Sequence, residues 1–195
     1  MDFVLPSKID SINKEESLKD DIDNFIYLKI RYDFLSHKYY LKDMGDSFGT
    51  YIKIDNTNIK EKTIINIGNT FLAFSYNIYL NNQNKNKSKK YLFLKIINEN
   101  KQYEPIILEE DKSSYLIGRA KNCDIQINDN FLSKINCTLY FENEMWKLQD
   151  GEKYGNKSTN GTWLYTSEDN EIYDKMIFKS NKYNFYCNFS TNFKS

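Results

Sequence analysis

Short segments in which apolar and polar residues alternate run along most of the chain. The first clear case extends from Ile26 to Tyr32, where apolar side chains take every second position and Lys29 and Arg31 lie between them. A period of two is typical of a half-buried strand, because successive side chains point to opposite faces. Similar segments recur as far as Phe189, and helical periodicity is nearly absent. The sequence therefore predicts an all-β protein, built as an antiparallel sandwich or barrel.

Changes in composition divide the chain into four regions. Residues 1–23 are polar and acidic, and we expect them to form a tail. Residues 24–80 and residues 91–189 carry strand patterns, and we expect one β module in each. Residues 81–90, NNQNKNKSKK, separate the two modules. A basic run of this kind can be a nucleic-acid or localisation patch, but a solvated linker is its commoner meaning, so we interpret it as a linker.

The two β modules echo each other. Residues 39–43 have the pattern Y-x-L-x-D, and residues 146–150 have the pattern W-x-L-x-D. In each case a loop follows, and a Gly-Thr pair opens the next strand at Gly49 and at Gly161. Two copies of one fold explain this similarity better than chance does.

Charge and hydropathy argue against nucleic acids and membranes as binding partners. The chain has 27 Lys plus Arg and 27 Asp plus Glu, so its formal net charge is zero. Non-specific nucleic-acid binding needs a clustered positive excess, and we therefore expect no specific nucleic-acid partner. No apolar run approaches the roughly 20 residues that a membrane span requires. The first residues also lack the basic and apolar regions of a secretory signal, so we expect no membrane association.

Cysteine and histidine usage indicates the compartment and argues against metal chemistry. The three cysteines, Cys123, Cys137 and Cys187, lack paired spacing, which favours a reducing compartment. We expect an intracellular protein, cytoplasmic or nuclear. The only histidine, His37, lies far along the chain from all three cysteines, so we expect no metal and no cofactor. No catalytic triad or phosphate-cradling glycine loop is present in the sequence, and we expect no catalysis.

Three short clusters in the second half carry the functional signal. They are Gly118-Arg119, Leu132–Cys137 (LSKINC) and Ser158–Trp163 (STNGTW). Their order and spacing resemble the forkhead-associated (FHA) family, in which Gly-Arg is followed by Leu-Ser, a histidine three residues after that serine, and then Asn-Gly-Thr. The three-part pattern is far more specific than any one motif. The resemblance implies an antiparallel β-sandwich over residues 91–189 that binds phosphothreonine peptides of partner proteins.

The clusters supply groups that suit a phosphate. Phosphothreonine carries a charge of about −1.5 to −2 and three acceptor oxygens, and Arg119 offers paired planar donors for them. The Ser133 hydroxyl donates further, and Lys134 adds an ammonium charge. By the resemblance, Asn160 holds the backbone of the bound peptide and Thr159 contacts the phosphothreonine side. The expected structural supports of the site are Gly118, Asn136 and Gly161.

The sequence departs from the family pattern at two places. Asn136 stands where the family has a histidine that supports the binding loops. Because an amide both donates and accepts, we expect it to replace the histidine in part. The first module resembles the second half of an FHA domain, ending in a glycine turn at Gly68. Phe48, however, stands at the position of the peptide-holding asparagine, so we interpret residues 24–80 as a partial or degenerate copy without a working site.

Two functions remain open. The first is a phosphothreonine-dependent adaptor that recruits phosphorylated protein partners, and the intact Arg119, Ser133 and Asn160 favour it. The alternative is a structural protein that uses the sandwich as an assembly surface without any dependence on phosphate. Asn136 and the degraded first module favour this alternative. The oligomeric state does not follow from the sequence.

Overall fold

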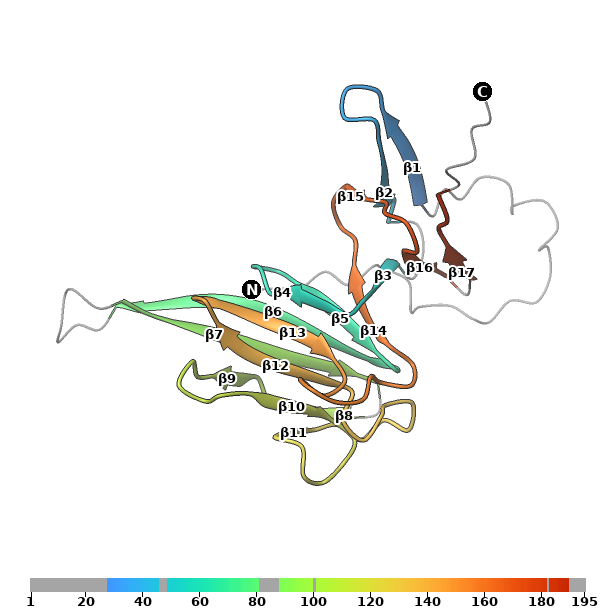
Figure 1. The fold of residues 1–195 in the computed structure, drawn as a ribbon. Coiled ribbons are helices and arrows are strands. Elements are labelled where there is room, and N and C mark those ends of the chain that lie inside the picture. The colour runs from blue at the N-terminus through green and yellow to red at the C-terminus, as the bar shows by residue number, and fades with distance from the viewer. Residues whose placement is uncertain (1–27, 46–48, 81–87, 100, 182, 190–195) are drawn as a thin grey trace, which may run out of the picture. The chain divides into compact units, whose positions relative to one another are not determined.

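The structure is a computed structural model that describes residues 28–45, 49–80, 88–99, 101–181 and 183–189 (Figure 1). These residues form strands, turns and loops, and almost all strand pairs are antiparallel. Within the described residues no helix is long and apolar enough to cross a membrane. The predicted fold class, an all-β antiparallel sandwich, is confirmed.

The chain separates into two compact units. Unit 1 comprises residues 1–53 and 165–195, and unit 2 comprises residues 54–164. Unit 2 is thus one continuous segment of the chain, inserted between the two segments that form unit 1.

Unit 2 contains two sheets. The first has the order β11-β10-β12-β13-β4 and the second has the order β14-β5-β6-β7-β8, with β9 also paired to β7. The first sheet consists of β11 (Ile125–Gln126), β10 (Tyr115–Gly118), β12 (Cys137–Glu142), β13 (Met145–Asp150) and β4 (Asn56–Asn58). The second sheet consists of β14 (Thr162–Tyr165), β5 (Ile64–Ile67), β6 (Thr70–Leu80), β7 (Ser88–Asn98), β8 (Lys101–Gln102) and β9 (Ile106–Leu108).

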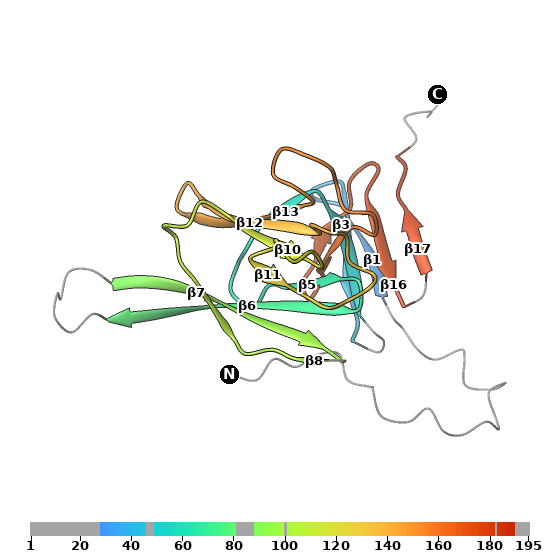
Figure 2. The ribbon, with the colours of Figure 1, turned by 90° about the horizontal axis from the view of Figure 1, so that it is seen from below.

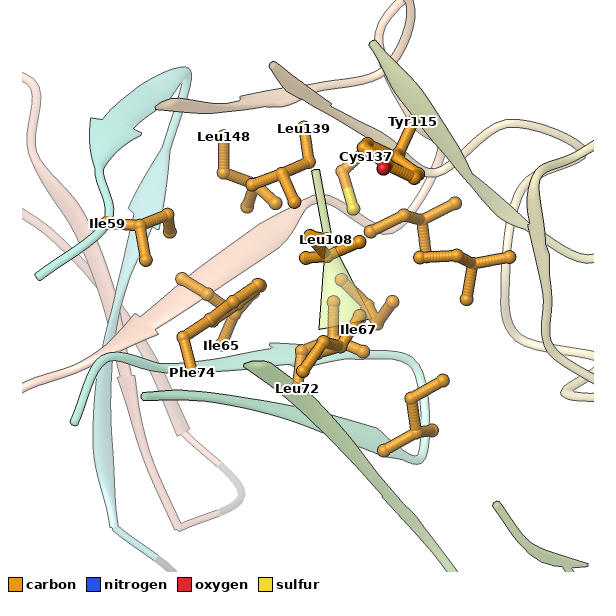
Figure 3. Packing of buried hydrophobic residues seen from close by; sticks show 14 of the residues in the cluster. Ile59, Ile65, Ile67, Leu72, Phe74, Leu108, Tyr115, Cys137, Leu139 and Leu148 are labelled. Atoms are coloured by element: carbon orange, nitrogen blue, oxygen red, sulfur yellow. The ribbon is translucent and has the colours of Figure 1, made fainter. Parts of the chain in front are cut away.

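The two sheets of unit 2 pack face to face over an apolar core. In the first sheet Leu139 of β12 lies opposite Leu148 of β13, and in the second Ile65 of β5 lies opposite Leu72 of β6. All four side chains are fully buried. Figure 2 shows the two layers, and Figure 3 shows these side chains meeting between them, with Leu108 of β9 in the middle. Burial of each such side chain contributes about 1.5–3 kcal/mol. The alternation read from the sequence therefore builds this core.

Strands β6 and β7 form a long hairpin. Their pairing runs without interruption from Thr70 opposite Asn98 to Leu80 opposite Ser88. The hairpin joins the strands before residue 80 to those after residue 88 within a single sheet, as Figures 1 and 2 both show.

Unit 1 has a smaller core between two three-stranded arrays. One array has the order β1-β2-β15, and β16 pairs with both β17 and β3 in the other. The strands are β1 (Leu28–Asp33), β2 (Lys38–Asp43), β15 (Asn170–Glu171), β17 (Tyr183–Tyr186), β16 (Ile177–Ser180) and β3 (Thr50–Ile54). The buried core residues are Leu41, Ile52, Ile172, Met176 and Phe178.

The structure divides the chain differently from the expected boundaries. Strands β4 to β6, from the expected first module (24–80), lie in unit 2, whereas β15 to β17, from the expected second module (91–189), lie in unit 1. Among the described residues, those of 24–80 therefore do not form one compact unit of their own. The physical reason is that a period of two fixes which face of a strand is buried but does not fix its neighbours.

The expected linker and tail are placed only in part. Residues 88–90 of the expected linker (81–90) belong to β7, paired to β6. Residues 81–87 and the expected tail (1–23) lie outside the described residues.

Candidate functional site

The end of β10 approaches the loop before β12 very closely. A Cβ on Gly118 would lie 2.3 Å from the backbone oxygen of Lys134 and 3.0 Å from the backbone nitrogen of Asn136. Only glycine fits this contact without a shift of backbone. The Arg119 amide donates to the Ser133 carbonyl oxygen at 3.2 Å, and the Asn136 amide donates to the Ile117 carbonyl oxygen at 2.8 Å. The first two sequence clusters are therefore joined through their backbones.

Asn136 lies beneath this loop and is fully buried. Its Oδ1 accepts a hydrogen bond from the Ser133 amide at 3.2 Å, and its Nδ2 donates to Thr162 Oγ1 at 3.4 Å. Its carbonyl oxygen also accepts from the Gly151 amide at 2.8 Å. One amide side chain thus uses both its acceptor and its donor to connect the loop of the second cluster to the strand of the third.

Asp150, at the end of β13, organises the third cluster. It is buried, and its Oδ1 accepts from Ser158 Oγ at 2.5 Å and from Thr162 Oγ1 at 2.7 Å. Its Oδ2 accepts from the Ser158 amide at 3.2 Å. The Ser158 Oγ in turn accepts from the Gly161 amide at 2.9 Å. Three hydroxyl and amide donors satisfy the buried carboxylate, which fixes both ends of the loop.

Sequence reasoning missed the role of Asp150 in the site. The repeated aspartate at the end of a strand, followed by Ser and Thr, was a usable signal, since short polar side chains with this spacing commonly cap a turn.

The second and third clusters contact each other directly. The Thr159 amide donates to Ser133 Oγ at 2.8 Å, and Ser133 Oγ lies 3.3 Å from Thr159 Oγ1. Asn160 Nδ2 donates to the carbonyl oxygen of Phe131 at 2.8 Å. Gly161 has a φ of +81°, which agrees with its expected role in a tight turn. All eight predicted site residues therefore lie in unit 2, on three loops that are bonded to one another.

The loops present positive charge and hydrogen-bond donors to solvent. The side chains of Arg119, Lys134, Thr159 and Asn160 are exposed, and Ser133 is half-buried. In the part of the chain that the structure describes, neither Arg119 nor Lys134 forms an ion pair with a carboxylate. The arrangement suits an oxyanion, because two cations and a hydroxyl lie on neighbouring loops.

The nearby thiols support the loops. Cys123 Sγ donates to the Lys134 carbonyl oxygen at 3.2 Å, and burial raises the pKa of the Cys123 thiol. Burial likewise raises the pKa of the fully buried Cys137 thiol. A thiol with a raised pKa is a poor nucleophile at neutral pH, so both cysteines act as packing groups. Among the described residues, no group of three or more His, Cys, Asp or Glu side chains could hold a metal ion.

Phe48, the residue expected to have disabled a site in the first half, lies outside the described residues.

Comparison with known proteins supports the resemblance over part of the chain. An FHA domain family model matches residues 115–180, a span that includes all eight predicted site residues. FHA domains are in general protein-interaction modules that bind phosphopeptides. The searches of curated proteins and of solved structures found no match.

Proposed function

We propose that this chain is a phosphothreonine-binding adaptor whose site is formed by the three loops around Ser133. The observation that carries the proposal is the bond from the Thr159 amide to Ser133 Oγ at 2.8 Å, near Arg119 and Lys134, neither of which is paired with a carboxylate among the described residues. A phosphate placed over these loops would meet Arg119, Lys134 and the Ser133 hydroxyl together. Each charge-assisted bond would contribute about 1.5–3 kcal/mol.

In this proposal the peptide itself lies against the third cluster. Asn160 uses its Nδ2 on Phe131, which fixes the amide plane and leaves Oδ1 to accept from a peptide amide. Thr159 lies between Asn160 and Ser133 and contacts the side of the phosphorylated residue. Gly118, Asn136 and Gly161 act only through the loops that they support.

The proposed partners are proteins phosphorylated on threonine, and the proposed compartment is intracellular. Cys123, Cys137 and Cys187 are all free thiols in the structure, which fits a reducing environment.

A specific observation favours phosphate-independent assembly as a second candidate. Strand β17 lies at the end of its array and exposes three aromatic side chains, Tyr183, Phe185 and Tyr186. An exposed strand with aromatic side chains is suited to pairing with another chain. An assembly of this kind would use unit 1 and would be indifferent to phosphorylation.

The test is binding of the full chain to an oriented phosphothreonine peptide library, with phosphoserine and unphosphorylated pools as controls. Selective retention of phosphothreonine peptides supports the adaptor function. Equal retention of all three pools, or of none by folded protein, contradicts it. Lys134→Ala should lower retention, whereas Lys121→Ala, an exposed lysine on a neighbouring loop, should not.

A further inference from the structure

Two parts of the chain are built in the same way, although they lie in different units. In unit 2, β4 pairs with β13 so that Thr57 lies opposite Leu148; in unit 1, β15 pairs with β2 so that Asn170 lies opposite Leu41. Leu148 and Leu41 are the central residues of the repeated pattern at the ends of β13 and β2. The next backbone bond is also matched, from Ile59 N to Trp146 O (2.8 Å) and from Ile172 N to Tyr39 O (2.7 Å).

The match continues through the following strands. In unit 2, β5 pairs with β14 so that Asn66 lies opposite Trp163; in unit 1, β16 pairs with β3 so that Lys179 lies opposite Tyr51. Trp163 and Tyr51 each follow the Gly-Thr pair of the repeat. The two segments therefore use the same register on equivalent partner strands.

The turn before β5 and β16 repeats to the level of single residues. Lys62 has a φ of +62° and Lys175 has a φ of +64°, in the left-handed region that non-glycine residues rarely adopt. The backbone bonds that follow are matched too, from Phe74 N to Thr63 O (2.9 Å) and from Cys187 N to Met176 O (2.9 Å). The described residues of 57–74 and 170–187 are thus structural repeats.

Each of the repeated segments pairs with strands that are distant from it in the sequence, and not with the strands that directly precede it. We call residues 56–80 (β4 to β6) the first donor segment and residues 170–186 (β15 to β17) the second donor segment. The first donor segment follows β2 and β3 in the chain, yet it pairs with β13 and β14. The second follows β13 and β14, yet it pairs with β2 and β3. Each donor segment therefore completes the array whose strands lie farther away in the sequence.

A contact in unit 2 distinguishes the first donor segment from its repeat. The Asn69 amide and Thr70 Oγ1 both donate to Asp129 Oδ2, at 2.8 and 3.0 Å. Gly68, with a φ of +55°, brings this turn so close that a Cβ there would lie 2.8 Å from Asp129 Oδ2. The first donor segment thus forms two hydrogen bonds to the Asp129 carboxylate through a turn in which a side chain at position 68 would be too close to that carboxylate.

The second donor segment lacks the glycine and the threonine of this turn. At the spacing set by the repeated turn, Asn181 corresponds to Gly68 and Tyr183 to Thr70. Asn181 adopts the same backbone, with a φ of +53°, but it carries a Cβ. Tyr183 has no hydroxyl on its Cβ. The second donor segment would therefore collide with Asp129 and leave that buried carboxylate with fewer donors.

Asp129 connects this turn to the candidate site. Its Oδ1 accepts from the Phe131 amide at 2.9 Å, and its carbonyl oxygen accepts from the Leu132 amide at 3.1 Å. The carbonyl oxygen of Phe131 in turn accepts from Asn160 Nδ2, and Ser133 lies two residues after Phe131 in the chain. The turn of the first donor segment thereby holds the loop that carries Ser133.

We propose that the turn Gly68–Thr70 is a positioning element of the candidate site, and that it selects the first donor segment to complete the site-bearing sandwich in place of its repeat. The positioning part rests on the proposed phosphopeptide function, whereas the selection part does not. The site would then depend on strands that lie before residue 115, outside the span of the family match.

Cysteine crosslinking of the full chain tests the selection. Asn58 lies opposite Lys147 on β13, and its repeat Glu171 lies opposite Tyr40 on β2. Directly opposed residues have Cα atoms about 4.5–5.5 Å apart, within reach of a disulfide. With the native cysteines replaced by alanine, Asn58→Cys with Lys147→Cys should oxidise to a crosslinked monomer, and Glu171→Cys with Lys147→Cys should not. A 147–171 crosslink, or a 58–147 crosslink found only in dimers, would overturn the proposal.

If the alanine background does not fold, the same pairs in the native-cysteine chain give the answer by mass spectrometry of the disulfide-linked peptides. Cys123 and Cys137 are buried, and any crosslink that involves the partly exposed Cys187 is identified by the mass of its peptide. This readout needs no ligand, so it stands even if the wild-type chain retains no phosphopeptide.

Binding to the phosphothreonine peptide library tests the positioning. Gly68→Asn places in this turn the residue that its repeat carries, and Asn181→Gly is the matched control. We expect Gly68→Asn to weaken binding at least tenfold and Asn181→Gly to leave it unchanged. Thr70→Val keeps the shape but removes one donor to Asp129, and it should weaken binding about threefold and speed hydrogen exchange at the Phe131 amide. Wild-type binding and exchange in Thr70→Val and Gly68→Asn would overturn the positioning role.

Discussion

The Oδ1 of Asn136 accepts a hydrogen bond from the Ser133 amide at 3.2 Å, and the same side chain donates to Thr162 from its other end. The amide is fully buried, so neither bond is exchanged with solvent. These two bonds use the acceptor and the donor of the residue that stands where the FHA family, which the chain resembles over residues 115–180, has a histidine. Both side chains can offer one donor and one acceptor. The buried Asn136 side chain therefore connects the loop of Ser133 to β14, although the sequence departs from the family pattern at this position.

Arg119→Ala should remove most of the affinity for phosphothreonine peptides. The guanidinium is exposed at the end of β10, so its loss removes charge but little packing. One charge-assisted bond of about 1.5–3 kcal/mol corresponds to a loss of at least tenfold. Fluorescence anisotropy with a library-selected peptide measures the affinity, and thermal unfolding should change little. Arg31→Ala, which removes an exposed arginine paired with Asp169 in unit 1, is the control. Wild-type affinity of Arg119→Ala would contradict the proposed role.

Asn136→Ala should lower both stability and affinity. It leaves the Ser133 amide without its acceptor in a buried setting, which costs about 1–3 kcal/mol in the free energy of unfolding. The loop of Ser133 would also lose its fixed position, so phosphopeptide binding should weaken more than stability alone explains. Urea denaturation and peptide titration measure the two effects. Asn122→Ala, at an exposed position, should change neither. A stable Asn136→Ala variant with normal binding would show that the amide is dispensable.

Much of unit 2 could be predicted from the sequence, because the relevant signals are local. Alternation located the core strands, including Leu139 and Leu148, since a period of two depends only on neighbouring residues. Gly118 and Gly161 stood at the tight approach and the tight turn for which glycine is needed. The three loops that meet in the structure were likewise found from short motifs at fixed spacing.

The partners of the strands could not be predicted. Ile65 and Phe178 have the same pattern, the same preceding turn and equivalent positions opposite β14 and β3. Neither strand carries a signal for the strand with which it pairs. The contact that selects the partner is made by a turn outside the strand and by Asp129, some 60 residues away in the chain. The compact units of the structure differ from the expected boundaries at residues 80 and 91 for this reason. Long-range pairing depends on such single contacts more than on strand propensity.

Deprotonation of Lys179 should contribute a rise in the stability of the chain between about pH 8 and 10. The buried thiols of Cys123 and Cys137 contribute a fall in the same window, because folding raises their pKa values. Burial lowers the pKa of Lys179 from its ordinary value of 10.5 to about 8. Between the folded and unfolded pKa values of Lys179 the unfolded chain binds more protons at this group, so its contribution to the free energy of unfolding rises with pH in this window. Below pH 8 both states carry the charge, and its burial opposes folding. A contact with the Tyr51 ring, 5.3 Å from the ammonium to the centroid, offsets part of that effect.

Lys179→Met should remove this rise, whereas Lys42→Met, at an exposed position, should keep it. Urea denaturation followed by circular dichroism at pH 7, 8, 9 and 10 measures the slope. The window must end near pH 10, because burial raises the pKa of Tyr51 and ionisation of tyrosine would lower stability above that point. An unchanged slope in Lys179→Met would mean that another group is responsible.

Leu148→Ala and Leu41→Ala form a matched pair at the centre of the repeat. Both leucines are fully buried, one in unit 2 and the other in unit 1. Truncation of either should cost about 2–5 kcal/mol in the free energy of unfolding, because it leaves a cavity among packed side chains. Only Leu148 packs in the sandwich that carries Ser133 and Asn160. At a temperature where circular dichroism shows both variants folded, Leu148→Ala should bind phosphothreonine peptides more weakly and Leu41→Ala should bind normally. An equal loss in both variants would mean that unit 1 also supports the site.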